Sequence, residues 1–165
     1  ARFVLVGSGN PEEGELRPQL LDRFGLSVDV KTPQDLQSRI EVVKRRDAFE
    51  RDPDAFLERW KKDDAKIRRK ITAGRDKLAS IDVPDDVLIK ASELCMKLGT
   101  DGLRGELTLM RAARALAALE SAAHVAVNHL KRVAPMALRH RLRRNPLDDA
   151  GSGTRVARAV EEVFA

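Results

Sequence analysis

Helix start and stop signals run from residue 32 to the end of the chain, and they constrain the fold more than any other feature. Thr32 followed by Pro33 predicts one helix start. The pair Asp52-Pro53 predicts a second start, which opens a long helix toward Leu78. Apolar positions are sparse in that long helix, so we expect it to be largely exposed. The pattern therefore predicts a mostly helical chain.

Four further segments carry apolar residues at helical spacing, namely 84–99, 103–119, 125–133 and 154–164. In the first of them, Cys95 lies on the apolar stripe, where an inert core thiol is expected. Gly99 is the expected stop of that helix, and Pro135 is expected to follow the end of the third. The residues of the second helix expected to face the core are Leu103, Leu107, Met110 and Leu116 or Ala117.

Two short apolar segments near the start are typical of β-strands. Phe3–Val6 shows no polar alternation, which indicates a strand buried on both faces. Leu26–Val30 follows a helical segment, Pro18–Phe24, and the order strand, helix, strand is typical of a parallel sheet. A lone buried strand cannot exist, so we expect the earlier strands upstream and treat residue 1 as an internal cut.

The predicted fold class is therefore α/β plus α-helical: the last two parallel strands of an α/β core, followed by a helical bundle. We divide the chain into the end of the core (1–32), long connecting helices (33–82) and a C-terminal helical domain (83–165).

Composition favours a soluble protein of the cytoplasm. The 31 Lys and Arg against 26 Asp and Glu give a net charge of +5, but the two signs are mixed, which is only weak support for nucleic-acid binding. With one cysteine, the chain cannot form an internal disulfide. The sequence has no run of 18 apolar residues, so no membrane insertion is expected.

The turn Gly7-Ser8-Gly9-Asn10-Pro11 is the first candidate for a functional site. Open α/β sheets bind ligands at the carboxyl ends of their strands, and the Asn10 amide there can orient a water molecule. An ordinary strand-ending turn is the alternative. The chain contains no G-x-x-x-x-G-K-[ST] phosphate loop.

Two arginines are candidate phosphate contacts. Arg23, which follows Asp22 at a helix end, is either half of a surface ion pair or an arginine presented to a neighbour's nucleotide, with Asp22 fixing its position. Arg104 lies at a helix start, where a cation is slightly misplaced unless an anion binds there. A solvated charge is the alternative for Arg104.

The remaining polar clusters favour structural roles. The histidines have no metal-type spacing, so we expect no metal site: His124, His129 and His140. The run Arg139–Arg144 is expected to be a solvated basic face, with docking of an acidic partner or a neighbouring subunit as the second possibility.

Three segments together, Phe3–Gly25, Gly99–Leu116 and Ala134–Gly153, strongly resemble the ATPase (I) subunits of magnesium chelatase, which are AAA+ proteins. The resemblance covers only the C-terminal half of such a subunit. It implies that Asn10 is the sensor 1 residue and that Arg23 is the arginine finger, with Asp22 beside it at the subunit interface. It also implies that Arg104 is the sensor 2 arginine, in its own site or a neighbour's.

For the whole protein, the resemblance implies an ATP-hydrolysing motor that drives Mg²⁺ insertion into protoporphyrin IX. ATP and Mg²⁺ would be bound mainly by the missing N-terminal half, so this chain alone should be inactive. The implied partners are further copies in a hexameric ring, a related AAA+ D subunit and a large porphyrin-binding H subunit. A MoxR-type ATPase is one alternative, and a nucleic-acid-binding module using residues 61–70 and 139–144 is another, although we expect no nucleic-acid partner.

Overall fold

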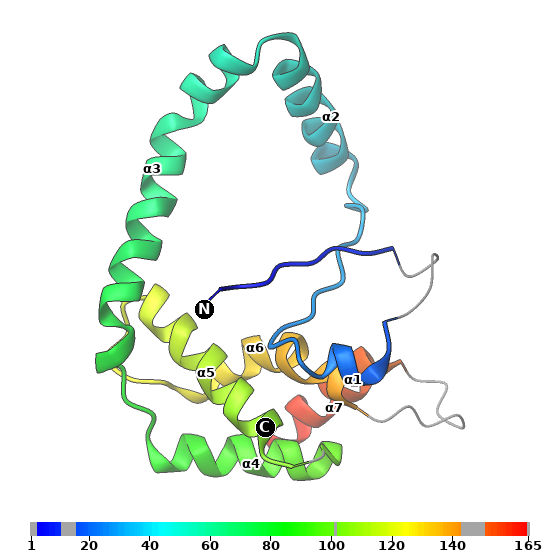
Figure 1. Cartoon of the computed structure of the whole chain (residues 1–165), viewed down its shortest axis with the longest axis vertical. Coiled ribbons are helices and arrows are strands. Elements are labelled where there is room, and N and C mark those ends of the chain that lie inside the picture. The colour runs from blue at the N-terminus through cyan, green and yellow to red at the C-terminus, as the bar shows by residue number, and fades with distance from the viewer. Residues whose placement is uncertain (1–2, 11–15, 101, 143–150, 165) are drawn as a thin grey trace.

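The computed structural model describes residues 3–10, 16–100, 102–142 and 151–164. Its helices in chain order are α1 (Pro18–Leu21), α2 (Leu36–Arg51), α3 (Pro53–Lys77), α4 (Asp85–Leu98), α5 (Arg104–Leu119), α6 (Val127–Leu138) and α7 (Ser152–Val163), with short 3-10 turns η2 (Leu78–Ser80) and η3 (Arg139–Arg141). Helices α2 and α3 form an arch that stands on a bundle of α4, α5, α6 and α7 (Figure 1).

Helix α2 begins three residues later than the predicted first helical position. Asp35 is its N-cap, and the Asp35 carboxylate accepts a hydrogen bond from the Ser38 backbone N–H at 2.9 Å. The start predicted at Thr32 and Pro33 is therefore wrong. Aspartate caps helices more strongly than threonine does, which explains why the helix starts after Asp35.

Helix α3 follows its prediction in start, length and exposure. The Asp52 carboxylate accepts a hydrogen bond from the Ala55 N–H at 3.0 Å, and Pro53 lies in the first turn. Of the residues of α3, only Gly74 is buried. A Cβ atom at position 74 would lie 3.1 Å from the Cα of Leu119, so this glycine lets the base of α3 pack closely on α5.

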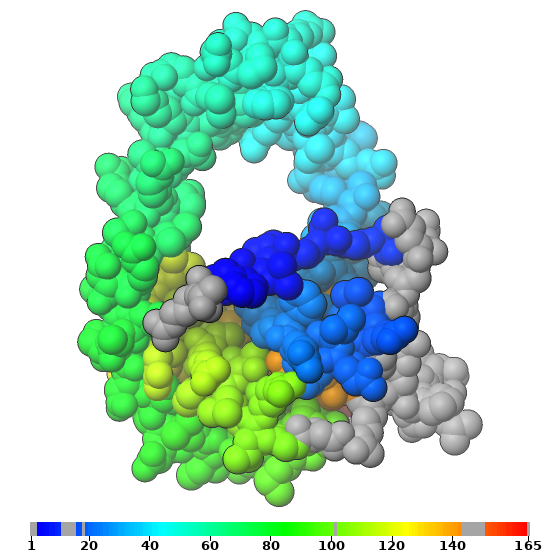
Figure 2. All heavy atoms as spheres, in the orientation of Figure 1, coloured from blue at the N-terminus to red at the C-terminus, as the bar shows by residue number. Residues whose placement is uncertain are grey.

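Aromatic side chains join the two helices at the top of the arch. The Phe49 and Phe56 rings pack edge to face with their centroids 5.7 Å apart, and the Phe56 and Trp60 centroids are 6.1 Å apart. The Arg45 guanidinium lies 4.7 Å from the Trp60 ring centroid. Below this cluster, α2, α3 and the segment 3–10 surround an opening through the molecule (Figure 2).

The hydrophobic core lies in the bundle. Helix α4 ends at Gly99, whose φ of 65° is the left-handed conformation expected of a glycine stop. Cys95 is fully buried there, and burial raises the pKa of its thiol to about 12, as expected for an inert core residue. The largest fully buried side chains are Leu94, Leu109, Leu130, Leu138, Val125, Val156 and Cys95.

The core-facing side of α5 differs from the prediction. Leu103 and Leu107 are 73% and 46% exposed, whereas Leu109 and Ala113, which were not predicted for the core, are fully buried. Ala117 is fully buried, as predicted for one of the pair Leu116 or Ala117. Met110 and Leu116, also predicted for the core, are partly buried against it. The buried stripe consists largely of small residues, which let α5 pack closely on α6, and leucines alone are therefore a poor guide to its direction.

Helix α6 also differs, because it continues past Pro135 to Leu138. Proline removes one helical hydrogen bond. Burial of Ala134, Ala137 and Leu138 on the core side offsets that loss.

The two predicted strands do not form among the described residues. Residues 3–10 and 26–30 are assigned to no strand, and among the described residues the only β-bridge is between Asp82 and His124. Val4 and Val30 are 91% and 94% exposed, as expected of strand segments without neighbouring strands to bury them. Their place in a sheet stays a prediction, and so do the domain boundaries.

Candidate functional site

The Asp22-Arg23 turn directly follows α1. The backbone N–H of Arg23 donates to the Leu20 carbonyl oxygen at 3.0 Å, and that of Phe24 donates to Leu21 at 3.0 Å, so the chain makes one tight turn. The Arg23 side chain is exposed, and within the described residues it makes no side-chain hydrogen bond or ion pair. Its guanidinium therefore has no anionic partner among the described residues and can bind an anion from outside them.

Arg141, in η3, holds this turn against the bundle. Its Nη1 donates to the Asp22 carbonyl oxygen at 2.9 Å and to the Asp22 carboxylate, and its Nη2 donates to the Phe24 carbonyl oxygen at 2.8 Å. On the bundle side, it donates to the Ala137 carbonyl oxygen at 3.1 Å and to the Thr108 hydroxyl at 3.3 Å. The Arg141 side chain is 4% exposed. The expectation of a solvated basic face is therefore wrong at this residue.

His140 adds a second contact to the same turn. Its Nε2 lies 3.0 Å from the Phe24 carbonyl oxygen, so Nε2 must carry the proton that is donated, while Nδ1 is buried without a partner. Burial is the main cause that lowers the pKa of His140, and the Arg141 charge lowers it further, against the Phe24 hydrogen bond. The neutral imidazole, protonated at Nε2 only, is therefore the form that fits these surroundings.

The Asp22 carboxylate joins the turn to Arg104 as well. One carboxylate oxygen accepts from Arg104 at the start of α5, and the other accepts from Arg141. No described bond joins the Asp22 carboxylate to the Arg23 side chain, and the role of Asp22 in fixing Arg23 stays a prediction. Asp22 instead bridges two arginines of the bundle, and it brings Arg23 and Arg104 into one neighbourhood.

The two ion pairs of Asp22 differ in exposure. Arg104 is 58% exposed and Asp22 is 43% exposed, and such surface pairs contribute about 0–1 kcal/mol to stability. Arg141 is almost fully buried, and removing the partners of a buried charge costs about 3–5 kcal/mol. The Arg104 pair can therefore break at small cost, whereas the Arg141 contacts persist.

Asn10 lies at the end of the extended segment 3–10 and is exposed. Residues 11–15, which connect it to α1, lie outside the described residues. The convergence of Asn10 with Arg23 and Arg104 stays a prediction.

Comparison with known proteins shows what this chain is similar to. Residues 89–162, which include Arg104 and Arg141, match the AAA lid domain. The magnesium-chelatase 38 kDa subunit of Rhodobacter capsulatus is 63% identical over 99% of this chain and 47% of its own length. The corresponding subunit of Cereibacter sphaeroides is 61% identical over 99% of this chain and 49% of its own. The chloroplastic magnesium-chelatase subunit ChlI of Oryza sativa subsp. indica is 46% identical over 99% and 40%.

Over its length, the chain is similar to the C-terminal half of magnesium-chelatase 38 kDa and ChlI subunits. It spans about half the length of the curated relatives it matches. Most of the helical bundle matches the AAA lid domain, and we call this bundle the lid. Arg104 and Arg141 are thus lid residues that contact a turn preceding the lid in the sequence.

Sequence reasoning missed Arg141 and His140 as parts of this site. Both lie in a basic run whose members look equivalent in the sequence. The signal that could have distinguished them from the rest of the run is their place directly after α6. Residues that follow the end of a buried helix remain close to the bundle surface. Arg139 shows the contrast, since its side chain is 20% exposed and pairs with Asp29 outside the turn.

Of the other two histidines, His129 makes structural contacts, whereas the His124 side chain is exposed. The His129 ring is buried, its Nδ1 accepts from the Ala126 N–H at 2.8 Å, and its Nε2 lies 3.4 Å from Glu120. Within the described residues, no group of three or more His, Cys, Asp or Glu is arranged to hold a metal ion. No helix in that part of the chain is long and apolar enough to span a bilayer.

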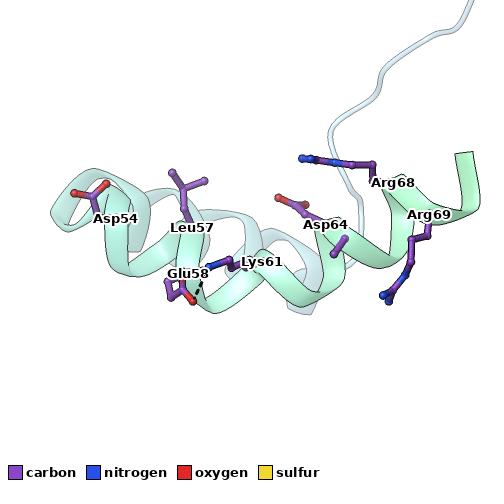
Figure 3. A pocket seen from close by; sticks show the side chains of 8 residues that line it. Asp54, Leu57, Glu58, Lys61, Asp64, Arg68 and Arg69 are labelled. Carbon is purple, nitrogen blue, oxygen red and sulfur yellow. Dashed lines mark hydrogen bonds and ion pairs between the residues drawn. The ribbon is translucent and has the colours of Figure 1, made fainter. Parts of the chain in front are cut away.

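A shallow hollow on α3 is the other feature that could suggest a site. Its lining side chains all come from this one helix and are Asp54, Leu57, Glu58, Lys61, Asp64, Ala65, Arg68 and Arg69 (Figure 3). Lys61 pairs with Glu58 within it. A single exposed helix cannot enclose a ligand, so we assign no binding role to this hollow.

Proposed function

We propose that the chain is part of the ATP-hydrolysing AAA+ motor subunit of magnesium chelatase and that the motor drives Mg²⁺ insertion into protoporphyrin IX for chlorophyll or bacteriochlorophyll synthesis. The observation that carries the proposal is the turn held by the lid. In the described structure, the Arg23 side chain is exposed and unpaired, and the preceding residue, Asp22, binds Arg104 through its carboxylate. The high identity to magnesium-chelatase subunits supports the choice of reaction.

The residues present fit part of a nucleotide site. Exposed guanidinium groups suit phosphate oxygens, and both Arg23 and Arg104 offer them. The sequence contains no phosphate loop, so we assign binding of ATP and Mg²⁺ mainly to the part of the subunit that this chain does not span. Bound ATP would supply the phosphoryl group for transfer, and Mg²⁺ part of the charge neutralisation around it.

In this proposal, each residue has one task. Arg23 reaches the nucleotide of the adjacent subunit and stabilises charge on the phosphoryl group, which in related reactions is worth about 10³ to 10⁵ in rate. Arg104 leaves Asp22 and contacts phosphate oxygens, in its own or a neighbouring site. Asn10 orients the attacking water. Because phosphoryl transfer depends on position and charge, no covalent role for the chain is needed.

Since Arg23 acts in trans, hydrolysis requires assembly. We propose a hexameric ring of this subunit in the cytoplasm, joined by a related AAA+ D subunit and by a large H subunit that carries the porphyrin.

The test is reconstitution of the full-length subunit with the D and H subunits. We expect ATP-dependent formation of magnesium protoporphyrin, measured by its fluorescence, and no formation when any one component is omitted. A MoxR-type motor would hydrolyse ATP without supporting this insertion. ATP hydrolysis with no metal insertion in the complete mixture would therefore refute the proposed reaction.

A further inference from the structure

Arg141 makes more contacts to the Asp22–Phe24 turn than any function assigned so far requires. Its guanidinium donates to two backbone carbonyl oxygens of the turn, at 2.9 Å for Asp22 and 2.8 Å for Phe24, and also to the Asp22 carboxylate. Carbonyl groups of a turn are fixed to the backbone, so these bonds determine where the backbone of Arg23, between them, lies.

The other end of the same guanidinium is anchored in the lid. Its Nε donates to the Ala137 carbonyl oxygen in α6 at 3.1 Å, and its Nη2 also reaches the Thr108 hydroxyl in α5 at 3.3 Å. One planar side chain thus connects two lid helices to the turn. A nearby backbone hydrogen bond, from the Ser27 N–H to the Met136 carbonyl oxygen at 2.9 Å, also holds the segment after the turn against α6.

We propose that Arg141 is a positioning residue for Arg23: it docks the Asp22–Phe24 turn on the lid and so sets the direction in which the Arg23 guanidinium is presented to the neighbouring subunit. The inference rests on the proposed function, in which Arg23 acts in trans. Arg141 itself contacts neither nucleotide nor reacting atoms.

The Asp22 carboxylate makes this docking part of the response to nucleotide. Arg104 and Arg141 hold opposite oxygens of the same carboxylate, and only the Arg104 pair is exposed. When Arg104 moves to a phosphate, Asp22 stays bound to Arg141, and the turn keeps its place on the lid. Movement of the lid therefore carries Arg23 with it.

Geometry, rather than charge alone, is what Arg141 provides. Arginine has five N–H donors in a rigid fork, whereas lysine has one ammonium group on a flexible stem. A lysine at 141 keeps the charge but cannot bind both carbonyl oxygens, the carboxylate and the lid at once. We therefore expect Arg141→Lys to fail in the same way as Arg141→Gln, although less severely.

Arg139→Gln is the matched control. Arg139 belongs to the same short turn, η3, and its side chain is mostly buried, but it pairs with Asp29 and makes no described contact with the Asp22–Phe24 turn. The control therefore removes one arginine and one ion pair beside the docking contact while leaving that contact intact.

The first measurement is hydrogen exchange of the full-length subunit, followed at the amides of residues 22–27. We expect exchange at least tenfold faster in Arg141→Gln and clearly faster in Arg141→Lys, with no change there in Arg139→Gln. Should Arg141→Gln not fold, Arg141→Lys decides. Unchanged exchange in a folded Arg141 variant would overturn the docking role without any reference to ATP hydrolysis.

The second measurement separates positioning from general damage. Rings of Arg141→Gln alone should show kcat for ATP at least tenfold lower with KM changed less than threefold. Mixing them with subunits that carry a substituted phosphate-loop lysine should restore hydrolysis, because an intact nucleotide site then meets a neighbour's intact Arg23. A damaged lid would lower nucleotide affinity and would not be rescued, which would overturn the inference.

The two failures are distinguishable. If wild-type rings hydrolyse ATP and Arg141→Gln rings do so equally well, the positioning role is wrong and the proposed function stands. If wild-type rings do not hydrolyse ATP, the proposed function is wrong, and with it the purpose assigned to Arg23.

Discussion

Three arginines near the Asp22 carboxylate differ in what surrounds them. Arg141 is buried and fully hydrogen-bonded, Arg104 is exposed and has one partner, and Arg23 is exposed with no side-chain partner among the described residues. A buried, satisfied guanidinium holds structure, whereas an exposed one can exchange its partner for a ligand. The surroundings of each side chain, rather than its residue type, therefore separate the positioning arginine from the two candidate phosphate contacts.

We predict that Arg104→Ala affects turnover far more than stability. The pair with Asp22 is exposed, so its loss should lower the free energy of unfolding by less than about 1 kcal/mol. If Arg104 contacts phosphate, the ATP hydrolysis rate of assembled rings should fall about 10²-fold. Arg111→Ala, at an exposed position of the same helix, is the control. Unchanged nucleotide affinity and rate in Arg104→Ala would count against the sensor role.

The lowered pKa of His140 predicts a loss of stability in acid. The fold lowers this pKa below the unfolded value of about 6.5, so the neutral ring is favoured on folding. That contribution is fully present above pH 6.5 and is lost as the pH falls through the folded-state pKa. Protonation would also place a second N–H, at Nδ1, where no described acceptor lies.

The measurement is the free energy of unfolding of the 165-residue chain at pH 7.5 and pH 5.5, from urea titrations. Glutamine at 140 can still donate to Phe24 but does not titrate, so His140→Gln should lose less stability between these two pH values than the wild type does. An equal loss in both proteins would show that His140 is not the group responsible.

The candidate residues could be predicted from the sequence only where a motif marked them. Arg23 and Arg104 lie within segments that resemble a known family, whereas Arg141 lies in a basic run that gives each member the same appearance. Its burial depends on where η3 meets the Asp22 turn, 119 positions away in the sequence. Local sequence patterns carry no information about that meeting.

At the level of helices, the start of α3 and the end of α4 were predicted correctly, whereas the start of α2, the end of α6 and the buried face of α5 were not. Asp52 and Gly99 mark ends through local hydrogen bonds and backbone conformation, which neighbouring residues determine. The face of α5 depends on which partner helix fits its small residues, and Leu107 illustrates the error, because it remains half exposed. The strand prediction for 3–6 depends even more on partners, since strand pairing lies wholly outside the segment.

The close packing of α3 on α5 gives a prediction at this scale. Any side chain at 74 meets the backbone of Leu119 and Ala118, at 3.1 to 3.3 Å from the added Cβ, and backbone cannot move aside as a side chain can. We predict that Gly74→Val lowers the free energy of unfolding by about 2 kcal/mol through overpacking. The control, Ala73→Val on the exposed side of α3, should cost less than about 1 kcal/mol. Equal effects of the two substitutions, in urea titrations, would refute this account of the contact.

For the whole molecule, the main consequence of the structure is that the lid and the Arg23 turn are one connected unit. Arg141 and His140 of the lid are hydrogen-bonded to the turn. After the turn, the chain forms the two helices of the arch and then the helices of the lid (Figure 1). In a ring of such subunits, the position of each Arg23 would depend on the lid of its own subunit.

Assembly predicts the behaviour of Arg23→Ala. Nucleotide binding by the full-length subunit should stay within about threefold of the wild type, because in the proposed ring the arginine belongs to the neighbour's site, while hydrolysis should fall by about 10³-fold. Binding is measured with a fluorescent nucleotide and hydrolysis by phosphate release. A wild-type rate in assembled Arg23→Ala rings would contradict the finger role.

The most direct test is a structure of the assembled full-length subunit with a non-hydrolysable ATP analogue. We predict that Arg23 of one subunit lies within hydrogen-bond distance of the γ-phosphate bound to the next, and that Arg104 has left Asp22 for a phosphate oxygen. Asn10 should lie beside the position of the attacking water. If all three side chains point away from every bound nucleotide, the motor function proposed for this chain is wrong.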